Sequence, residues 1–87
     1  MNVQVMLNKM NSGQLQVTVV QGGQSTGTGM AYRTTDEVRD VLRSLRLDDH
    51  AVEARLQILE QIESNELLKF PSDISPEILH ANGFTAV

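Results

Sequence analysis

Three arginines have the spacing in this chain that most suggests binding chemistry. Arg39, Arg43 and Arg46 follow one another at intervals of four and three residues, which places them on one edge of a helix. As a binding feature, they form a basic strip that could meet an acidic partner or a phosphate backbone. As a structural feature, they form ion pairs with the acidic flank of the next helix, made of Asp49, Glu53, Glu60 and Glu63. We favour the ion pairs and keep the interface as the alternative.

A fourth arginine, Arg55, lies within an apolar helix stripe, between Leu59 and Ile62 in projection. Its methylene groups could pack against the stripe while the guanidinium reaches water or a carboxylate such as Glu63. Arginine is also enriched at binding hot spots, so Arg55 could belong to an interface. Arg39, Arg43, Arg46 and Arg55 are therefore the candidate partner-binding residues.

No set of residues has the spacing of a catalytic or metal site. His50 and His80 lie in separate helices, and no HxH or HExxH spacing occurs. No serine stands in a G-x-S-x-G or S-x-x-K motif. The pair Asp48-Asp49 is explained by helix capping, and the absence of cysteine excludes thiolate nucleophiles and cysteine metal sites. We expect a protein that is not an enzyme and has no metal or cofactor.

The glycine-rich segment 22–29 superficially resembles a phosphate-binding loop. Such a loop needs a lysine and a helix directly after it. Here Thr28 stands in the place of the lysine, and the next helix begins several residues later. The segment is better interpreted as a hairpin turn that leads into a strand.

The elements that position these residues follow from a change of hydrophobic period near Thr34. Before it, apolar residues alternate with polar ones over residues 2–9 and 14–21, which predicts two strands joined by a turn at residues 10–13. Residues 25–33 are expected to form a third strand, although Gly27, Gly29 and Ala31 share one of its faces. After Thr34, apolar residues recur at the spacing of one helix face: Val38, Val41, Leu42 and Leu45.

The helix boundaries have capping signals. Thr34 and Glu37 form a capping box for a first helix that runs to about Arg46. Asp48 or Asp49 caps a second helix that ends near Ser64-Asn65, and the tight link makes the two helices neighbours.

The tail has one further helix signal. We expect residues 66–74 to be irregular or extended. Ser75 and Pro76 then begin a short helix that Asn82-Gly83 stops.

Composition limits the partners and the location. A net charge of −4 repels a phosphate backbone on average and so disfavours general nucleic-acid binding. No segment has the length and apolarity of a membrane span, and the lack of cysteine is typical of a reducing compartment, so we expect a cytoplasmic protein without membrane contact. With one Tyr and two Phe the core is poor in large rings, so a second copy could complete it as a homodimer.

The sequence thus predicts a single α+β domain over residues 1–87, in the order β-β-β-α-α-α. A three-stranded antiparallel meander packs against a helical hairpin, and a short C-terminal helix closes an edge. The favoured function is a small non-enzymatic protein-interaction module, self-associating or binding a protein partner through a sheet edge, a sheet face or a helix face. The alternative is a nucleic-acid-associated regulatory protein that uses the arginine strip of the first helix.

Overall fold

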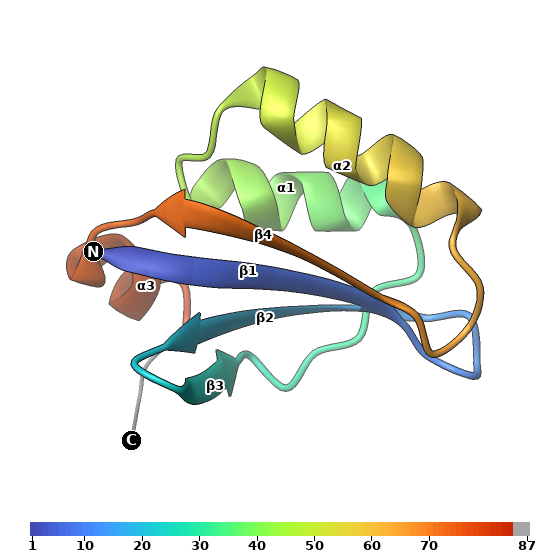
Figure 1. Cartoon of the computed structure of the whole chain (residues 1–87), viewed down its shortest axis with the longest axis horizontal. Helices are drawn as coiled ribbons and strands as arrows, with labels where there is room; N and C mark the ends of the chain where they lie inside the picture. Colours follow the sequence, from blue (N-terminus) through green and yellow to red (C-terminus); the bar gives the residue numbers. More distant parts are fainter. Residues whose placement is uncertain (85–87) are drawn as a thin grey trace.

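The chain forms a four-stranded sheet with helices on one of its faces (Figure 1). The computed structural model describes residues 1–84. Its elements, in chain order, are β1 (Asn2–Lys9), β2 (Leu15–Gln21), β3 (Gln24–Gly27), α1 (Thr35–Ser44), α2 (Asp49–Gln61), β4 (Leu67–Asp73) and α3 (Pro76–Ala81). The α+β class and the antiparallel sheet are as predicted.

The number of strands is a correction. The sheet has the order β3-β2-β1-β4 with every pair antiparallel, so the tail expected to be irregular or extended supplies a fourth strand. In β4 the pairing runs from Asn2 opposite Asp73 to Asn8 opposite Leu67. The predicted antiparallel meander therefore gains one strand: β4 lies at the edge of the sheet, the position in which a strand tolerates Pro71, which lacks an N–H donor.

The third strand is shorter than predicted. β3 ends at Gly27, and Gly29 has a φ of 77°, which breaks the extended conformation. Only Tyr32 returns to the sheet, through reciprocal backbone hydrogen bonds of 2.7 Å with Leu15.

The predicted helix starts are confirmed. The side chains of Thr34, Asp48 and Ser75 accept hydrogen bonds from backbone N–H groups in the first turns of α1, α2 and α3. The capping box is only half formed, because the Glu37 carboxylate accepts from the Arg33 N–H at 3.4 Å. The helices also end earlier than expected, at Ser44 and Gln61.

The core lies between the sheet and the helices, as the alternation predicts. Val5, Leu7 and Val19 are fully buried beneath Val38, Leu42 and Val52. α1 contacts β2, while α2 contacts β1 and β4. At one end Phe84 folds back and its N–H donates to the Leu79 carbonyl at 2.8 Å, so the end of α3 seals the core.

Candidate functional site

The arginine strip of α1 is largely engaged in ion pairs with carboxylates. The Arg39 Nε lies 2.7 Å from the Glu53 Oε2 on α2, and the same guanidinium also pairs with Asp36. The Arg43 Nε lies 3.6 Å from the Asp49 Oδ1. Two of the three arginines therefore contact the acidic flank of α2, as the favoured interpretation predicts. Of the other two acidic residues named for this flank, Glu60 accepts from the Thr35 hydroxyl, and Glu63 has no ion pair with a described residue.

These contacts fix the charge states of the interhelical pair. The hydrogen bond from Arg39 holds the pKa of the Glu53 carboxyl below its ordinary value. In turn, Glu53 and then Asp36 raise the pKa of the Arg39 guanidinium. The pair stays ionised at neutral pH, and both partners are in part exposed to solvent.

Arg46 has a different environment. It follows the end of α1 with a φ of 63°, in the left-handed region that favours glycine. Its side chain is exposed, and no carboxylate of residues 1–84 forms an ion pair with it.

Arg55 is half-buried and lies over an aromatic ring. Its guanidinium carbon is 5.2 Å from the centroid of Phe70, within the range of a cation–π contact. Its Nε is shielded from solvent and has no hydrogen-bond acceptor within the described part of the chain. The expected ion pair with Glu63 does not form.

Arg46 and Arg55 line the same cavity. It has a volume of about 260 Å³ and lies between the turn after α1, the first half of α2, and β4. Phe70 and Pro71 contribute its β4 wall. The structure therefore divides the four candidate arginines into two groups. Arg39 and Arg43 form ion pairs with carboxylates, and Arg46 and Arg55 line a cavity.

A smaller hollow lies at the opposite end of α2. It has a volume of about 200 Å³, and its lining includes Lys9, Arg33 and Glu60. The Lys9 ammonium donates to the Ile62 carbonyl at 2.9 Å, which satisfies the carboxyl end of α2. Lys9 therefore has a structural role there.

The glycine-rich segment is a hairpin turn, as interpreted. Gly22 and Gly23 have φ values of 53° and 82° between the paired residues Gln21 and Gln24. Two positive φ values are what a two-residue hairpin loop requires.

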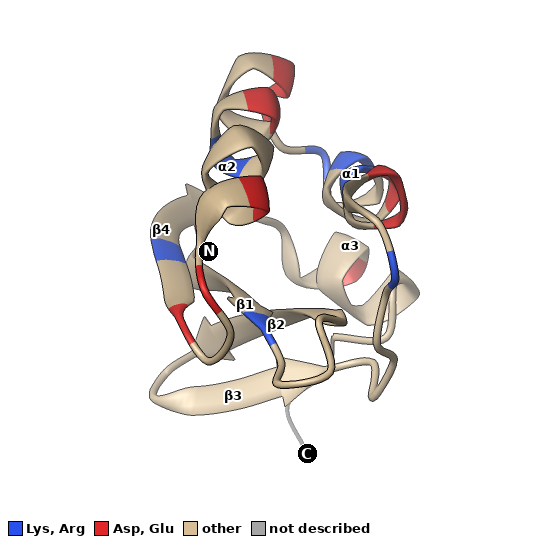
Figure 2. Ribbon diagram, turned by 90° about the vertical axis from the view of Figure 1, so that its right-hand side faces the viewer, with Lys and Arg blue, Asp and Glu red and all other residues tan. Residues whose placement is uncertain are grey.

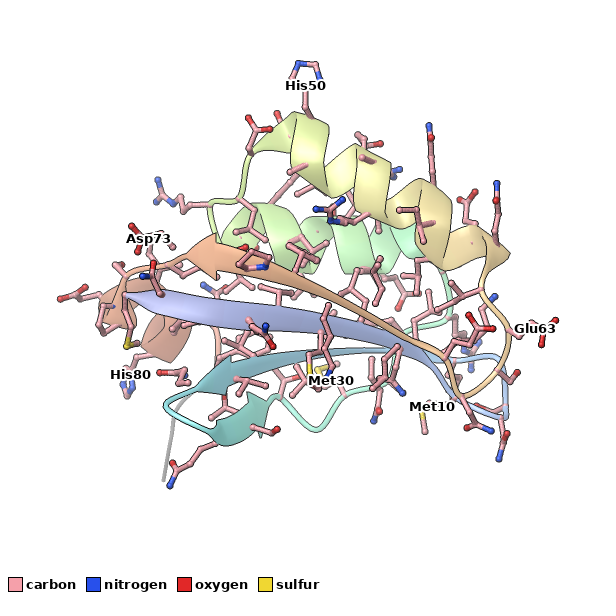
Figure 3. The ribbon with its side chains drawn as sticks, in the orientation of Figure 1. Met10, Met30, His50, Glu63, Asp73 and His80 are labelled. Atoms are coloured by element: carbon pink, nitrogen blue, oxygen red, sulfur yellow. The ribbon has the colours of Figure 1, made fainter. Side chains whose placement is uncertain are left out.

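The histidines do not meet. In Figure 3 His50 projects away from the start of α2, and His80 lies on α3 at the lower left of the sheet. Residues 1–84 contain no group of three or more His, Asp or Glu side chains placed to hold a metal ion.

One face of the sheet is left open. In Figure 2 the three helices lie on one side of the strands, and no helix of the described residues lies over the other side. The strand residues on this open face alternate with the buried ones. We define the open face as Asn2, Gln4, Met6, Asn8, Gln16, Thr18, Val20, Ser25, Gly27, Leu67, Lys69, Pro71 and Asp73.

The sequence predicted the alternation that gives β1 and β2 a polar face, but it did not predict the part of this face that β4 supplies, nor the cavity. The available signal was Lys69 and Pro71, because lysine and proline are common in edge strands. Recognising 67–73 as an edge strand would have placed Phe70 beneath α2, opposite Arg55.

Comparisons with protein-family models, with curated proteins and with solved structures give no match. In the part of the chain that the structure describes, no helix has both the length and the apolarity needed to cross a membrane.

Proposed function

We propose that this chain is a small non-enzymatic protein-interaction module that associates with a second copy of itself through the open face of its sheet. The observation that carries the proposal is a four-stranded sheet that, within residues 1–84, has helices on one face only. The arguments concern the chemistry of the open face, the edges of the sheet and the placement of charge.

The open face has few charged side chains for a surface of this acidic chain. Its central strands present amides and hydroxyls together with Met6 and Val20. Leu67, at the β4 edge, has 54% of its surface exposed. Because a charged surface on a chain of net charge −4 would repel its own copy, a nearly uncharged face is the favourable place for self-association.

The sheet edges are less suited to pairing with another chain. β3 has only four residues, and β4 contains Lys69 and Pro71. A short strand, a lysine and a proline each disfavour strand addition. The sheet face is therefore the better candidate than either edge.

The two charges on the open face favour a second copy as the occupant. Among the described residues, Lys69 and Asp73 are the only charged side chains that the strands present there, and Pro71 lies midway between them. In a two-fold dimer the same patch meets itself. An axis across the strands near Pro71, which is opposite Gln4, would place each Lys69 against the Asp73 of the other copy. Asp73 would then accept from Lys69 in addition to the Met1 ammonium of its own chain.

The alternative function, nucleic-acid-associated regulation through the strip on α1, has less support. Arg39 and Arg43 already have carboxylate partners, so less positive charge is available for phosphates. A cytoplasmic location is part of the favoured proposal, supported by a sequence without cysteine.

Sedimentation equilibrium tests the proposal directly. The unmodified chain should show a concentration-dependent monomer–dimer equilibrium. Gln4→Lys and Gln4→Glu should each weaken the dimer by about tenfold or more, because a charge of either sign would be desolvated at the centre of the face. Gln57→Lys is the matched control, since Gln57 is exposed on α2, away from the sheet.

A charge exchange tests the two-fold arrangement. Lys69→Asp alone should weaken the dimer, and adding Asp73→Lys should restore part of the affinity because the pairs are rebuilt with opposite polarity. A chain that sediments as a monomer at every concentration would refute self-association. Equal weakening by the Gln4 and Gln57 variants would refute the open face as its site.

A further inference from the structure

The cavity between α2 and β4 has a pair of arginines that the self-association proposal does not use. Two arginines and two aspartates line it: Arg46, Arg55, Asp48 and Asp73. The formal charges cancel, but the acidic and basic members differ in whether they already have partners.

Both carboxylates are engaged within the protein. The Asp48 carboxylate accepts from the Ala51 N–H at 3.0 Å and caps α2. The Asp73 carboxylate accepts from the Met1 ammonium at 2.6 Å. Neither Arg46 nor Arg55 forms an ion pair with any residue from 1 to 84. The positive charge at the cavity is therefore the charge available to a ligand.

Arg55 supplies the second observation. Its buried Nε lacks an acceptor, and a shielded donor without a partner is uncommon in folded proteins. The Phe70 ring beneath the guanidinium keeps the group at the cavity. A guanidinium that lies over a ring face can still offer N–H donors to a planar anion.

Arg46 is kept at the cavity at a conformational cost. Its φ of 63° is one that glycine adopts without strain. Replacing Arg46 with glycine would therefore remove the side chain and relieve the backbone at the same time. Such a substitution separates ligand binding from stability, because it should not unfold the protein.

The remaining lining selects among anions. Leu47, Ala51, Phe70 and Pro71 give the cavity an apolar wall. The nearby Asp48 and Asp73 carboxylates repel a dianion more than a monoanion. A volume of about 260 Å³ suits a compact ligand rather than a nucleotide. From these features we infer that the cavity binds a small organic monocarboxylate, with Arg46 and Arg55 holding its carboxylate and the apolar wall holding its body.

Titration with benzoate, followed by amide chemical shifts of the full chain, tests this inference. Benzoate should shift the resonances of the α1–α2 turn, the start of α2 and residues 70–73. Two other compounds should bind at least about tenfold more weakly than benzoate. Benzyl alcohol has the same ring without the charge, and inorganic phosphate has charge without an apolar part.

Variants identify the groups that bind. Arg46→Gly should lower benzoate affinity by about tenfold while the melting temperature stays the same or rises. Arg55→Lys keeps the charge but loses the planar fork, so it should also weaken binding. Arg43→Gln is the control, because it removes one positive charge from the last turn of α1 without touching the cavity lining.

Three results would overturn the inference. They are no saturable shift with benzoate, phosphate binding as tightly as benzoate, or unchanged benzoate affinity in a folded Arg46→Gly variant. Because Arg46 and Arg55 lie outside the open face, failure of this inference would leave the self-association proposal standing.

Discussion

The two faces of the sheet are built from the same strands but differ in what covers them. On the covered face Val5, Leu7 and Val19 have no exposed surface, because α1 and α2 lie over them. On the open face their chain neighbours Met6 and Val20 remain partly exposed among amides and hydroxyls. The comparison shows that strand alternation specifies which side chains share a face and which of the two faces is apolar, while the helices supply the cover that turns the apolar face into the core.

Alanine substitution of two neighbouring residues of β1 should give the largest contrast between the faces. Leu7→Ala should lower the free energy of unfolding by about 2–5 kcal/mol, because it removes a fully buried side chain and leaves a cavity. Met6→Ala should cost less than about 1 kcal/mol in the monomer, since Met6 is already partly solvated. Urea unfolding monitored by circular dichroism at low protein concentration measures both, and equal losses would mean that the open face is also packed.

Thr26 is a polar residue on the otherwise apolar covered face, and its substitution should give the next largest change in stability. It is buried, and its hydroxyl donates to the Val19 carbonyl at 2.9 Å. Thr26→Val keeps the shape but removes this hydrogen bond, so unfolding should become easier by about 1 kcal/mol. Ser25→Ala, the adjacent change on the open face, should stay within about 0.5 kcal/mol. A neutral Thr26→Val would show that the hydroxyl is dispensable in this core.

The parts of the structure that were predictable depend on local chemistry. Alternation in 2–9 and 14–21 is a property of neighbouring residues, and the bounds of β1 agree with it. The caps at Thr34, Asp48 and Ser75 each bond within three residues of themselves. Such signals survive in the sequence because both partners lie in the same short segment.

The parts that were missed depend on pairing between distant segments. β4 exists because Val5 pairs with Phe70 across the chain, and no local pattern in 67–73 declares that partner. The cavity likewise needs the α1–α2 turn and β4 to meet beside Arg55. The four arginines were therefore identifiable as a set, but only the tertiary structure divides them into ion-paired and available members.

Acidic pH should produce the smallest of these changes in stability, and it should act through the helix layer and not through the open face. In the helix layer, Arg39 depresses the pKa of the folded-state Glu53 carboxyl, so the pair's contribution is fully present above the unfolded pKa. It is lost as pH falls through the lower folded pKa. Melting temperatures compared between neutral and acidic pH should therefore show a smaller acid-induced decrease in Glu53→Gln than in the unmodified chain.

The control for this measurement is Glu63→Gln, which makes the same charge change at an exposed residue that has no ion pair among residues 1–84. Its acid-induced decrease should match that of the unmodified chain. If both variants respond alike, the Arg39–Glu53 contact adds nothing measurable, as is common for solvated pairs. Arg39 and Arg43 could then leave their carboxylate partners with little loss of folding stability. The case for these two arginines as partner-binding residues would become stronger.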